Sequence, residues 1–106
     1  MGYDLSRRGD SYDGDGTSFN CTGWASLLRI GEEGGWEPAG TVVGGAMCSS
    51  GYFMNEGQTV SSRDAREWAD AVETQIAEEE KKHGAKWGKM LRGFVKFARR
   101  GAFQIN

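Results

Sequence analysis

Residues 61–100 carry two consecutive amphipathic patterns, and these patterns constrain the fold more than any other feature of the sequence. In residues 61–82 the apolar side chains fall within an arc of roughly 100° on a helix, and they are Ala65, Trp68, Ala69, Val72 and Ile76. Residues 86–100 carry a second apolar set, which comprises Trp87, Met90, Leu91, Phe94, Phe97 and Ala98. Because only a short link around Gly84 separates the patterns, we expect two antiparallel helices whose apolar faces meet.

Local signals mark the ends of both helices. Ser61 and Asp64 resemble a capping box in which Asp replaces the usual Glu or Gln. His83-Gly84 is expected to end the first helix, and Gly101 is a suitable C-cap for the second.

A third helix is expected over residues 21–33. Trp24, Leu27 and Leu28 follow the i, i+3, i+4 spacing, and Asn20 is a suitable N-cap. Gly34-Gly35 should end this helix, and the internal Gly31 should weaken it, as should Gly23.

The rest of the chain favours short strands and turns. Residues 41–43 and 52–54 are β-prone, and Tyr3 and Leu5 alternate with polar residues as in a brief strand. The small residues of 44–51 predict a mobile loop, followed by a turn at 55–58. The tail at 102–105 alternates and is expected to return to the sheet as an edge strand.

The chain has 106 residues, a length that fits one domain with its own core. These patterns together predict an α+β fold in which a small antiparallel sheet packs with three helices. We expect a single domain over residues 1–106.

Two cysteines and one histidine exclude a four-ligand zinc site made of such residues, because only Cys21, Cys48 and His83 are present. No secretory signal is recognisable, so we expect reduced thiols at half-buried packing positions in a cytoplasmic protein. No stretch is long and apolar enough to span a bilayer, so no membrane partner is expected.

The acidic residues 10–16 invite a calcium interpretation. Asp13, Asp15 and Gly16 match the third, fifth and sixth positions of an EF-hand loop. The twelfth position is Thr22 instead of the required Glu, so a solvated turn is favoured. We therefore expect no metal and no cofactor.

Acid–base or nucleophilic catalysis would have to use His83, the only histidine. It lies at the end of the first long helix, where a solvated residue favours the helix dipole. The run of residues 78–80, three glutamates, is typical of a solvated face. The sequence therefore predicts no catalytic residues and a protein that is not an enzyme.

Charge is distributed unevenly along the chain. Residues 81–106 hold eight basic and no acidic residues, whereas residues 1–80 hold five basic and fifteen acidic ones. A basic helix face can bind phosphates or an acidic partner surface, although the acidic half could also neutralise it internally. The candidate partner-binding residues are Lys86, Lys89, Arg92, Lys96, Arg99 and Arg100.

Several motifs resemble an uncharacterised group of small bacterial and phage proteins. They are a G-W-x-P-A-G-T segment at residues 35–41, an N-x-G-Q-x-V turn at 55–60 and a G-x-F-x-I tail at 101–105. An Ala-rich helix and a Phe-rich helix lie between the last two. The resemblance implies a small accessory protein of bacterial or phage origin and carries no activity with it.

We therefore expect a non-enzymatic binding or inhibitory protein that occupies the surface of a larger macromolecule, a protein or a protein–nucleic-acid complex. A phage-encoded inhibitor of host defence, such as an anti-CRISPR protein, is one concrete form. The alternative is an accessory protein that binds nucleic acid directly through its basic C-terminal helix. A third hypothesis is a small hydrolase that uses carboxylates. The sequence leaves the oligomeric state open.

Overall fold

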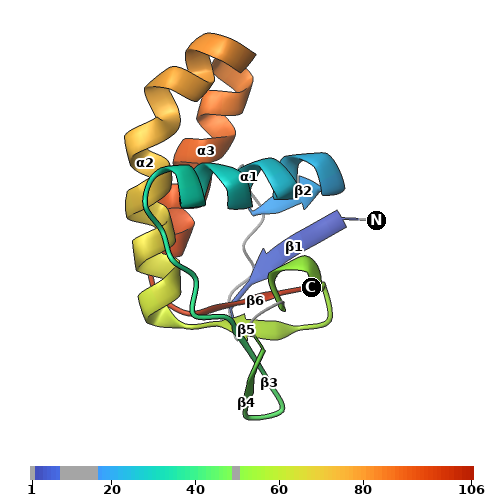
Figure 1. The fold of residues 1–106 in the computed structure, drawn as a ribbon. Helices are drawn as coiled ribbons and strands as arrows, with labels where there is room; N and C mark the ends of the chain where they lie inside the picture. The colour runs from blue at the N-terminus through green and yellow to red at the C-terminus, as the bar shows by residue number, and fades with distance from the viewer. Residues whose placement is uncertain (1, 8–16, 49–50) are drawn as a thin grey trace.

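The computed structural model of the chain describes residues 2–7, 17–48 and 51–106. These residues form an α+β fold in which three helices pack with a six-stranded antiparallel sheet, as predicted (Figure 1). The helices are α1 (Cys21–Glu33), α2 (Ser62–His83) and α3 (Ala85–Ala98), with a short 3-10 helix, η1 (Gly51–Phe53). The strands are β1 (Gly2–Ser6), β2 (Ser18–Asn20), β3 (Thr41–Val43), β4 (Ala46–Cys48), β5 (Gln58–Val60) and β6 (Phe103–Ile105).

The sheet has the strand order β2-β1-β6-β5-β3-β4. The tail does form a strand, β6, but the expected edge position is wrong, because β6 lies between β1 and β5. Its register places Ile105 opposite Leu5, and Phe103 opposite Val60. All four side chains are buried, so they belong to the core face of the sheet. The C-terminal strand is therefore packed within the fold.

Residues 44–54 differ from the expectation in two places. Gly44 and Gly45 have φ values of 57° and 84°, which suit a tight turn that joins β3 to β4 as a hairpin. Residues 46–48 are therefore a strand rather than part of a mobile loop. The β-prone residues 52–54 form no strand; η1 ends at Phe53, because Tyr52 turns inward to pack in the core.

Helices α2 and α3 run antiparallel side by side, and α1 crosses them (Figure 1). Trp68 of α2 is fully buried and lies 4.7 Å from Phe94 of α3, ring centroid to ring centroid, which confirms the predicted helix pair. Trp68 also stacks on Trp36 at 4.4 Å and meets Trp24 of α1 edge to face at 5.4 Å. One indole therefore joins both long helices, α1 and the segment before β3.

Both predicted N-caps are present. The Asn20 side chain accepts a hydrogen bond from the Gly23 backbone N–H at 2.7 Å, and Ser61 Oγ accepts one from the Asp64 N–H at 3.1 Å. The second half of the predicted capping box is absent, because the Asp64 carboxylate turns into the core. The α3 helix ends at Ala98, and Gly101 follows with a φ of 116° that turns the chain into β6.

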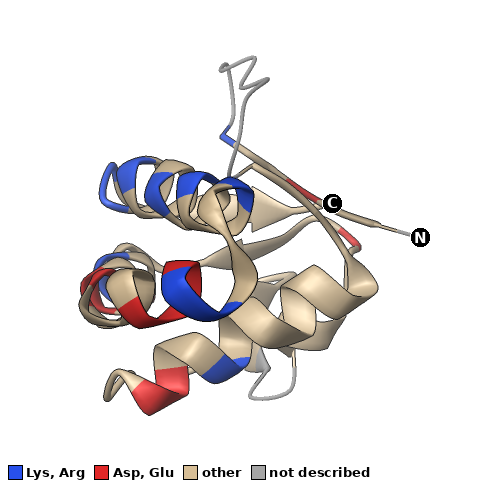
Figure 2. Cartoon of the chain, turned by 90° about the horizontal axis from the view of Figure 1, so that it is seen from above, with Lys and Arg blue, Asp and Glu red and all other residues tan. Residues whose placement is uncertain are grey.

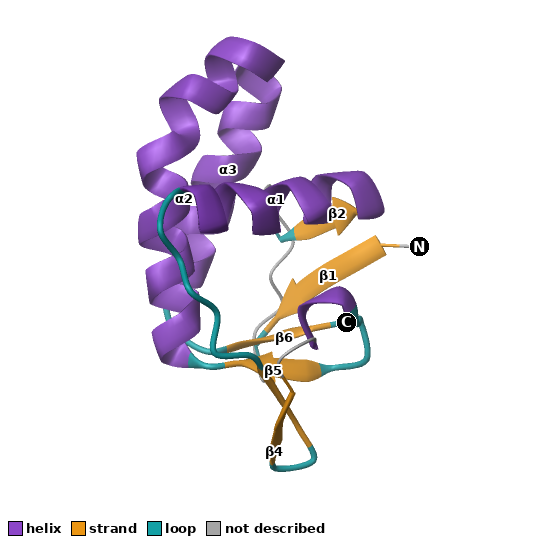
Figure 3. Ribbon diagram, viewed as in Figure 1, coloured by secondary structure: helices purple, strands orange, loops and turns teal. Residues whose placement is uncertain are grey.

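One end of the molecule is formed by the long helices and the other by the β3–β4 hairpin (Figure 3). The long helices extend beyond the sheet, so the end of α2 and the start of α3 lie far from β3 and β4. The start of α1 follows directly after β2, at the opposite edge of the sheet from β4.

Candidate functional site

The predicted basic face lies along α3. All six candidate residues are solvent-exposed, as expected: Lys86, Lys89, Arg92, Lys96, Arg99 and Arg100. Lys and Arg gather along α3, while Asp and Glu gather on α2 and at the end of α1 (Figure 2). Because α3 packs through Leu91, Phe94 and Phe97, its basic face is held on a rigid support.

Two of the six residues form ion pairs with α2. Arg92 donates two hydrogen bonds to the Glu80 carboxylate, at 2.7 and 3.1 Å. Arg99 donates to both oxygens of Glu73, at 2.9 and 2.7 Å, and to Asp70 at 3.1 Å. The acidic half of the chain therefore compensates part of the basic face, which was the alternative interpretation of the charge asymmetry.

These pairs shift the pKa values of Glu73, Glu80 and Arg99. Hydrogen bonding to Arg99 lowers the pKa of Glu73, and hydrogen bonding to Arg92 lowers the pKa of Glu80. The pKa of Arg99 is raised by its hydrogen bonds to Glu73 and Asp70. All of these groups are therefore charged at neutral pH.

The remaining four basic residues lie farther round α3, away from α2. At 100° per residue Lys86, Lys89 and Lys96 share an arc of about 80° and span about 15 Å along the axis, and Arg100 follows in the turn after α3. We call this set the outer strip; it comprises Lys86, Lys89, Lys96 and Arg100. The basic face thus has two parts, an edge paired with α2 and an outer strip.

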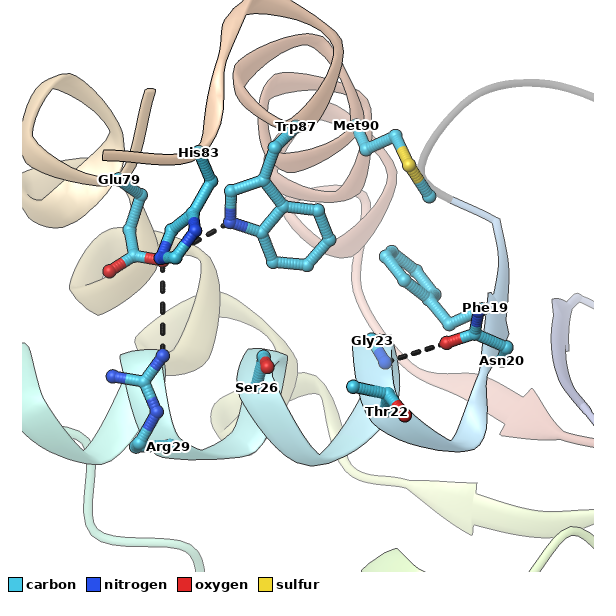
Figure 4. A pocket seen from close by; sticks show the side chains of 10 residues that line it. All are labelled: Phe19, Asn20, Thr22, Gly23, Ser26, Arg29, Glu79, His83, Trp87 and Met90. Carbon is cyan, nitrogen blue, oxygen red and sulfur yellow. Dashed lines mark hydrogen bonds and ion pairs between the residues drawn. The ribbon is translucent and has the colours of Figure 1, made fainter. Parts of the chain in front are cut away.

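A pocket of about 470 Å³ lies between the first turns of α1, the end of α2 and the start of α3. One part of its wall is apolar and comes from Phe19, Trp87 and Met90. At the other end Arg29, Glu79 and His83 converge from α1 and α2 (Figure 4).

Glu79 is the central polar group of this pocket, and only 5% of the residue is exposed. Its Oε1 accepts a hydrogen bond from Trp87 Nε1 at 3.1 Å. Arg29 Nη2 lies 3.9 Å from the same oxygen, and His83 Nε2 lies 4.0 Å from it. Both distances exceed that of a hydrogen bond, so Glu79 and His83 are not arranged as a hydrogen-bonded acid–base pair.

The sequence interpretation missed this cluster. The glutamates at 78–80 were expected to form a solvated face, yet Glu79 is buried while its two neighbours are not. The helical register contained the signal, because Glu79 follows Val72 and Ile76 at i+7 and i+3 and so lies on the apolar face. His83 is exposed, as expected, but it adjoins a buried carboxylate.

The structure also bears on metal sites, thiols and membrane-spanning helices. Across residues 2–7, 17–48 and 51–106 no three His, Cys, Asp or Glu side chains cluster in a way that could hold a metal ion. The acidic residues 10–16 lie outside the described residues. Cys21 lies at an exposed position rather than the half-buried one expected. None of the described helices has the length and apolar character needed to cross a membrane.

We compared the sequence and the structure with known proteins. No protein-family model matches the sequence, and neither curated proteins nor solved structures give a significant match.

Proposed function

We propose that this chain is a non-enzymatic binding protein that occupies the surface of a larger macromolecule through the basic face of α3. The observation that carries the proposal is the exposure of all six basic side chains, four along α3 and two, Arg99 and Arg100, directly after its end. That helix is fixed to the core, so its charges are presented to a partner in a defined arrangement at little entropic cost. Charged groups arranged in this way steer association and set specificity.

The edge next to α2 favours a protein surface over a bare phosphate backbone. There the guanidinium groups of Arg92 and Arg99 alternate with the carboxylates of Asp70, Glu73 and Glu80. A polyphosphate laid across this edge would meet these carboxylates, whereas a protein partner can match both signs of charge. The large aromatic side chains of α3 are buried or half-buried, so the basic face has no stacking platform for bases.

In this role the chain would be a small cytoplasmic accessory protein of bacterial or phage origin. An inhibitor of host defence such as an anti-CRISPR protein would act in this way, by covering a functional surface of a protein or protein–nucleic-acid complex. The second candidate is direct binding of nucleic acid through the outer strip, which the four cations on one side of α3 favour.

A pair of crosslinking variants tests where the partner binds. A photoreactive amino acid replaces Lys96 in the outer strip or, as a control, the exposed Lys82 on α2. After illumination in host cells, we expect one host protein to be enriched with the Lys96 variant over the Lys82 variant. Equal labelling from both positions would contradict a binding surface on α3.

Matched charge variants then separate the two candidates. The first replaces the outer strip with Gln, and the control replaces four exposed basic residues of α2, Arg63, Arg66, Lys81 and Lys82, with Gln. The two variants have the same net charge, and surface changes of this kind usually alter stability by less than about 0.5 kcal/mol each. With the purified partner we expect only the first variant to bind more weakly, mainly through a slower on-rate at low salt.

A DNA duplex of mixed sequence provides the discriminating titration. If the strip binds phosphates, the wild-type protein will bind the duplex, and each lost contact will reduce the salt slope by about one. That result would establish the second candidate instead. Wild-type affinity of the strip variant for the protein partner at every salt concentration would refute the basic face as the site.

A further inference from the structure

The pocket between α1 and α3 combines a buried carboxylate with an aromatic wall. Phe19 and Glu79 are almost fully buried, while Trp87 and Met90 are half-buried and accessible from the pocket. The indole of Trp87 extends from α3 toward α1, above Ser26 (Figure 4). The volume of about 470 Å³ is within the range of small-molecule sites.

The Glu79 carboxylate has no cation at hydrogen-bond distance among the described residues. Arg29, the nearest guanidinium, uses its Nη1 to bind Glu33, at 2.6 and 3.0 Å, and its Nη2 stays 3.9 Å from Glu79. The Arg29 guanidinium therefore provides one positive charge for two carboxylates, Glu33 and Glu79. Within the described part of the chain, Glu79 Oε2 accepts no hydrogen bond, so the carboxylate has capacity for another donor.

A buried carboxylate without a directly bound cation costs folding free energy. A ligand cation would recover that cost, because it could donate a hydrogen bond to Glu79 Oε2. Its charge would also balance the negative charge that Arg29, shared between Glu33 and Glu79, leaves uncompensated. An anionic ligand would instead be repelled by Glu79 and Glu33. The faces of Trp and Phe attract cations, and the thioether of Met adapts to an alkyl stem.

We propose that this pocket binds an alkylammonium group, with the ammonium at Glu79 and the apolar stem against Phe19, Trp87 and Met90. The chemistry is shared by free amines and by the side chain of a lysine. This site goes beyond the basic face of α3, since its key group is an acid and it takes a cation.

A titration of the full chain with four small probes tests the charge requirement. The probes are n-pentylamine, n-pentanol, n-pentanoate and methylammonium, and the readout is the indole N–H resonance of Trp87, assigned with a Trp87→Phe variant. We expect saturable shifts with pentylamine and affinity lower by about tenfold or more for the alcohol and the carboxylate. Methylammonium should bind more weakly because it lacks the stem. Equal shifts with the alcohol or the carboxylate would overturn the proposal.

Matched variants test the residue. Glu79→Gln keeps an oxygen that can accept from Trp87 and removes the charge, whereas Glu78→Gln makes the same charge change at an exposed neighbour. We expect only Glu79→Gln to lose pentylamine binding. If Glu79→Gln fails to fold, Ser26→Met fills the pocket from α1 and should abolish binding while Glu79 is intact. Wild-type affinity in a folded Glu79→Gln or Ser26→Met protein would refute the site.

A lysine derivative distinguishes the two sources of the ligand. Nα-acetyl-lysine-N-methylamide presents the same ammonium with peptide groups on either side. Tighter binding than pentylamine would identify a protein lysine as the occupant, and weaker binding would identify a free amine. No saturable binding of either cation would refute the proposal.

Discussion

The carboxylate of Asp64 connects three segments, and its loss should be among the most destabilising single changes in the chain. It is fully buried and accepts hydrogen bonds from the backbone N–H groups of Ala39 and Gly40, at 3.0 to 3.2 Å. It also accepts one from the Tyr52 hydroxyl at 2.7 Å. The start of α2 is thereby joined to η1 and to the segment that enters β3.

Asp64→Ala would leave three donors without their acceptor. At about 1–3 kcal/mol for each unsatisfied buried group, we expect a loss of about 3–9 kcal/mol in the free energy of unfolding. Tyr52→Phe removes only one donor and should cost about 1.5–3 kcal/mol, the range for a hydrogen bond to a charged group. In the Asp64→Ala background the same Tyr52→Phe change should be neutral or stabilising, because it removes a hydroxyl that has already lost its partner.

Urea denaturation at pH 7, followed by far-UV circular dichroism, measures all four proteins of this cycle. We expect a coupling free energy of at least about 1.5 kcal/mol, the magnitude of a hydrogen bond to a charged group, between the two positions. If Tyr52→Phe costs the same in both backgrounds, the bond to Asp64 contributes nothing to stability and the reasoning is refuted.

The same bond has a consequence at alkaline pH. Burial, and then the bond to Asp64, raise the pKa of Tyr52 above its ordinary value of 10.0. The folded state therefore favours the neutral phenol, so this contribution to stability is complete below pH 10 and is lost as the pH rises above it. Tyr52→Phe should remove that part of the alkaline loss of stability.

Three further changes and one addition have defined outcomes. Trp68→Ala should cost on the order of 3–5 kcal/mol by urea denaturation, and no loss would remove this indole from the core. Gly31→Ala would place its Cβ 2.5 Å from the Trp68 ring, so it should cost about 1–3 kcal/mol even though Ala favours helix; a gain in stability would contradict that packing. Hydrogen bonding to Arg99 lowers the pKa of Glu73, so this pair stabilises the fold above about pH 4.5 and the effect is lost as the pH falls further; denaturation at several pH values should show a shallower acid loss for Arg99→Gln. Calcium or zinc should leave the melting temperature unchanged, and an increase of several degrees would reveal a site that we do not expect.

Periodicity was sufficient to predict the helices because their apolar faces are continuous. The stripe from Ala65 to Ile76 is buried against the stripe around Phe94, and the start of α1 follows from the Asn20 cap. Gly31 shows the limit of propensity, since it was expected only to weaken α1. Atoms of the Trp68 and Trp36 rings lie 2.5 to 2.8 Å from the position that a Cβ would take, so the absence of a side chain at Gly31 allows α1 to approach these rings closely.

The sheet was harder to predict, since its order depends on contacts distant in the sequence. Alternation in the tail is the same for an edge strand and a central one, and only the pairing with β1 and β5 decides between them. Tyr52 illustrates the same effect, because its β propensity is overridden by burial beside Trp36 and by the bond to Asp64. For the candidate site, the sequence predicted the exposed basic face and left its neutralisation by the acidic half as an alternative. Which residues form the pairs with α2 depends on how the helices pack.

The two proposed sites adjoin each other on α3, and this links them in a testable way. On the helix the outer strip is bordered by the α2 carboxylates on one side, and on the other side by Met90, which lines the pocket. A protein bound to the outer strip therefore lies next to the pocket and can place a lysine in it. If it does, Glu79→Gln weakens the same complex that the outer-strip variant weakens, and pentylamine competes with the partner. If the pocket binds a free amine instead, Glu79→Gln leaves the partner's affinity unchanged and only the binding of the amine is lost. Measuring both affinities for this one variant decides whether the protein has one composite surface or two independent sites.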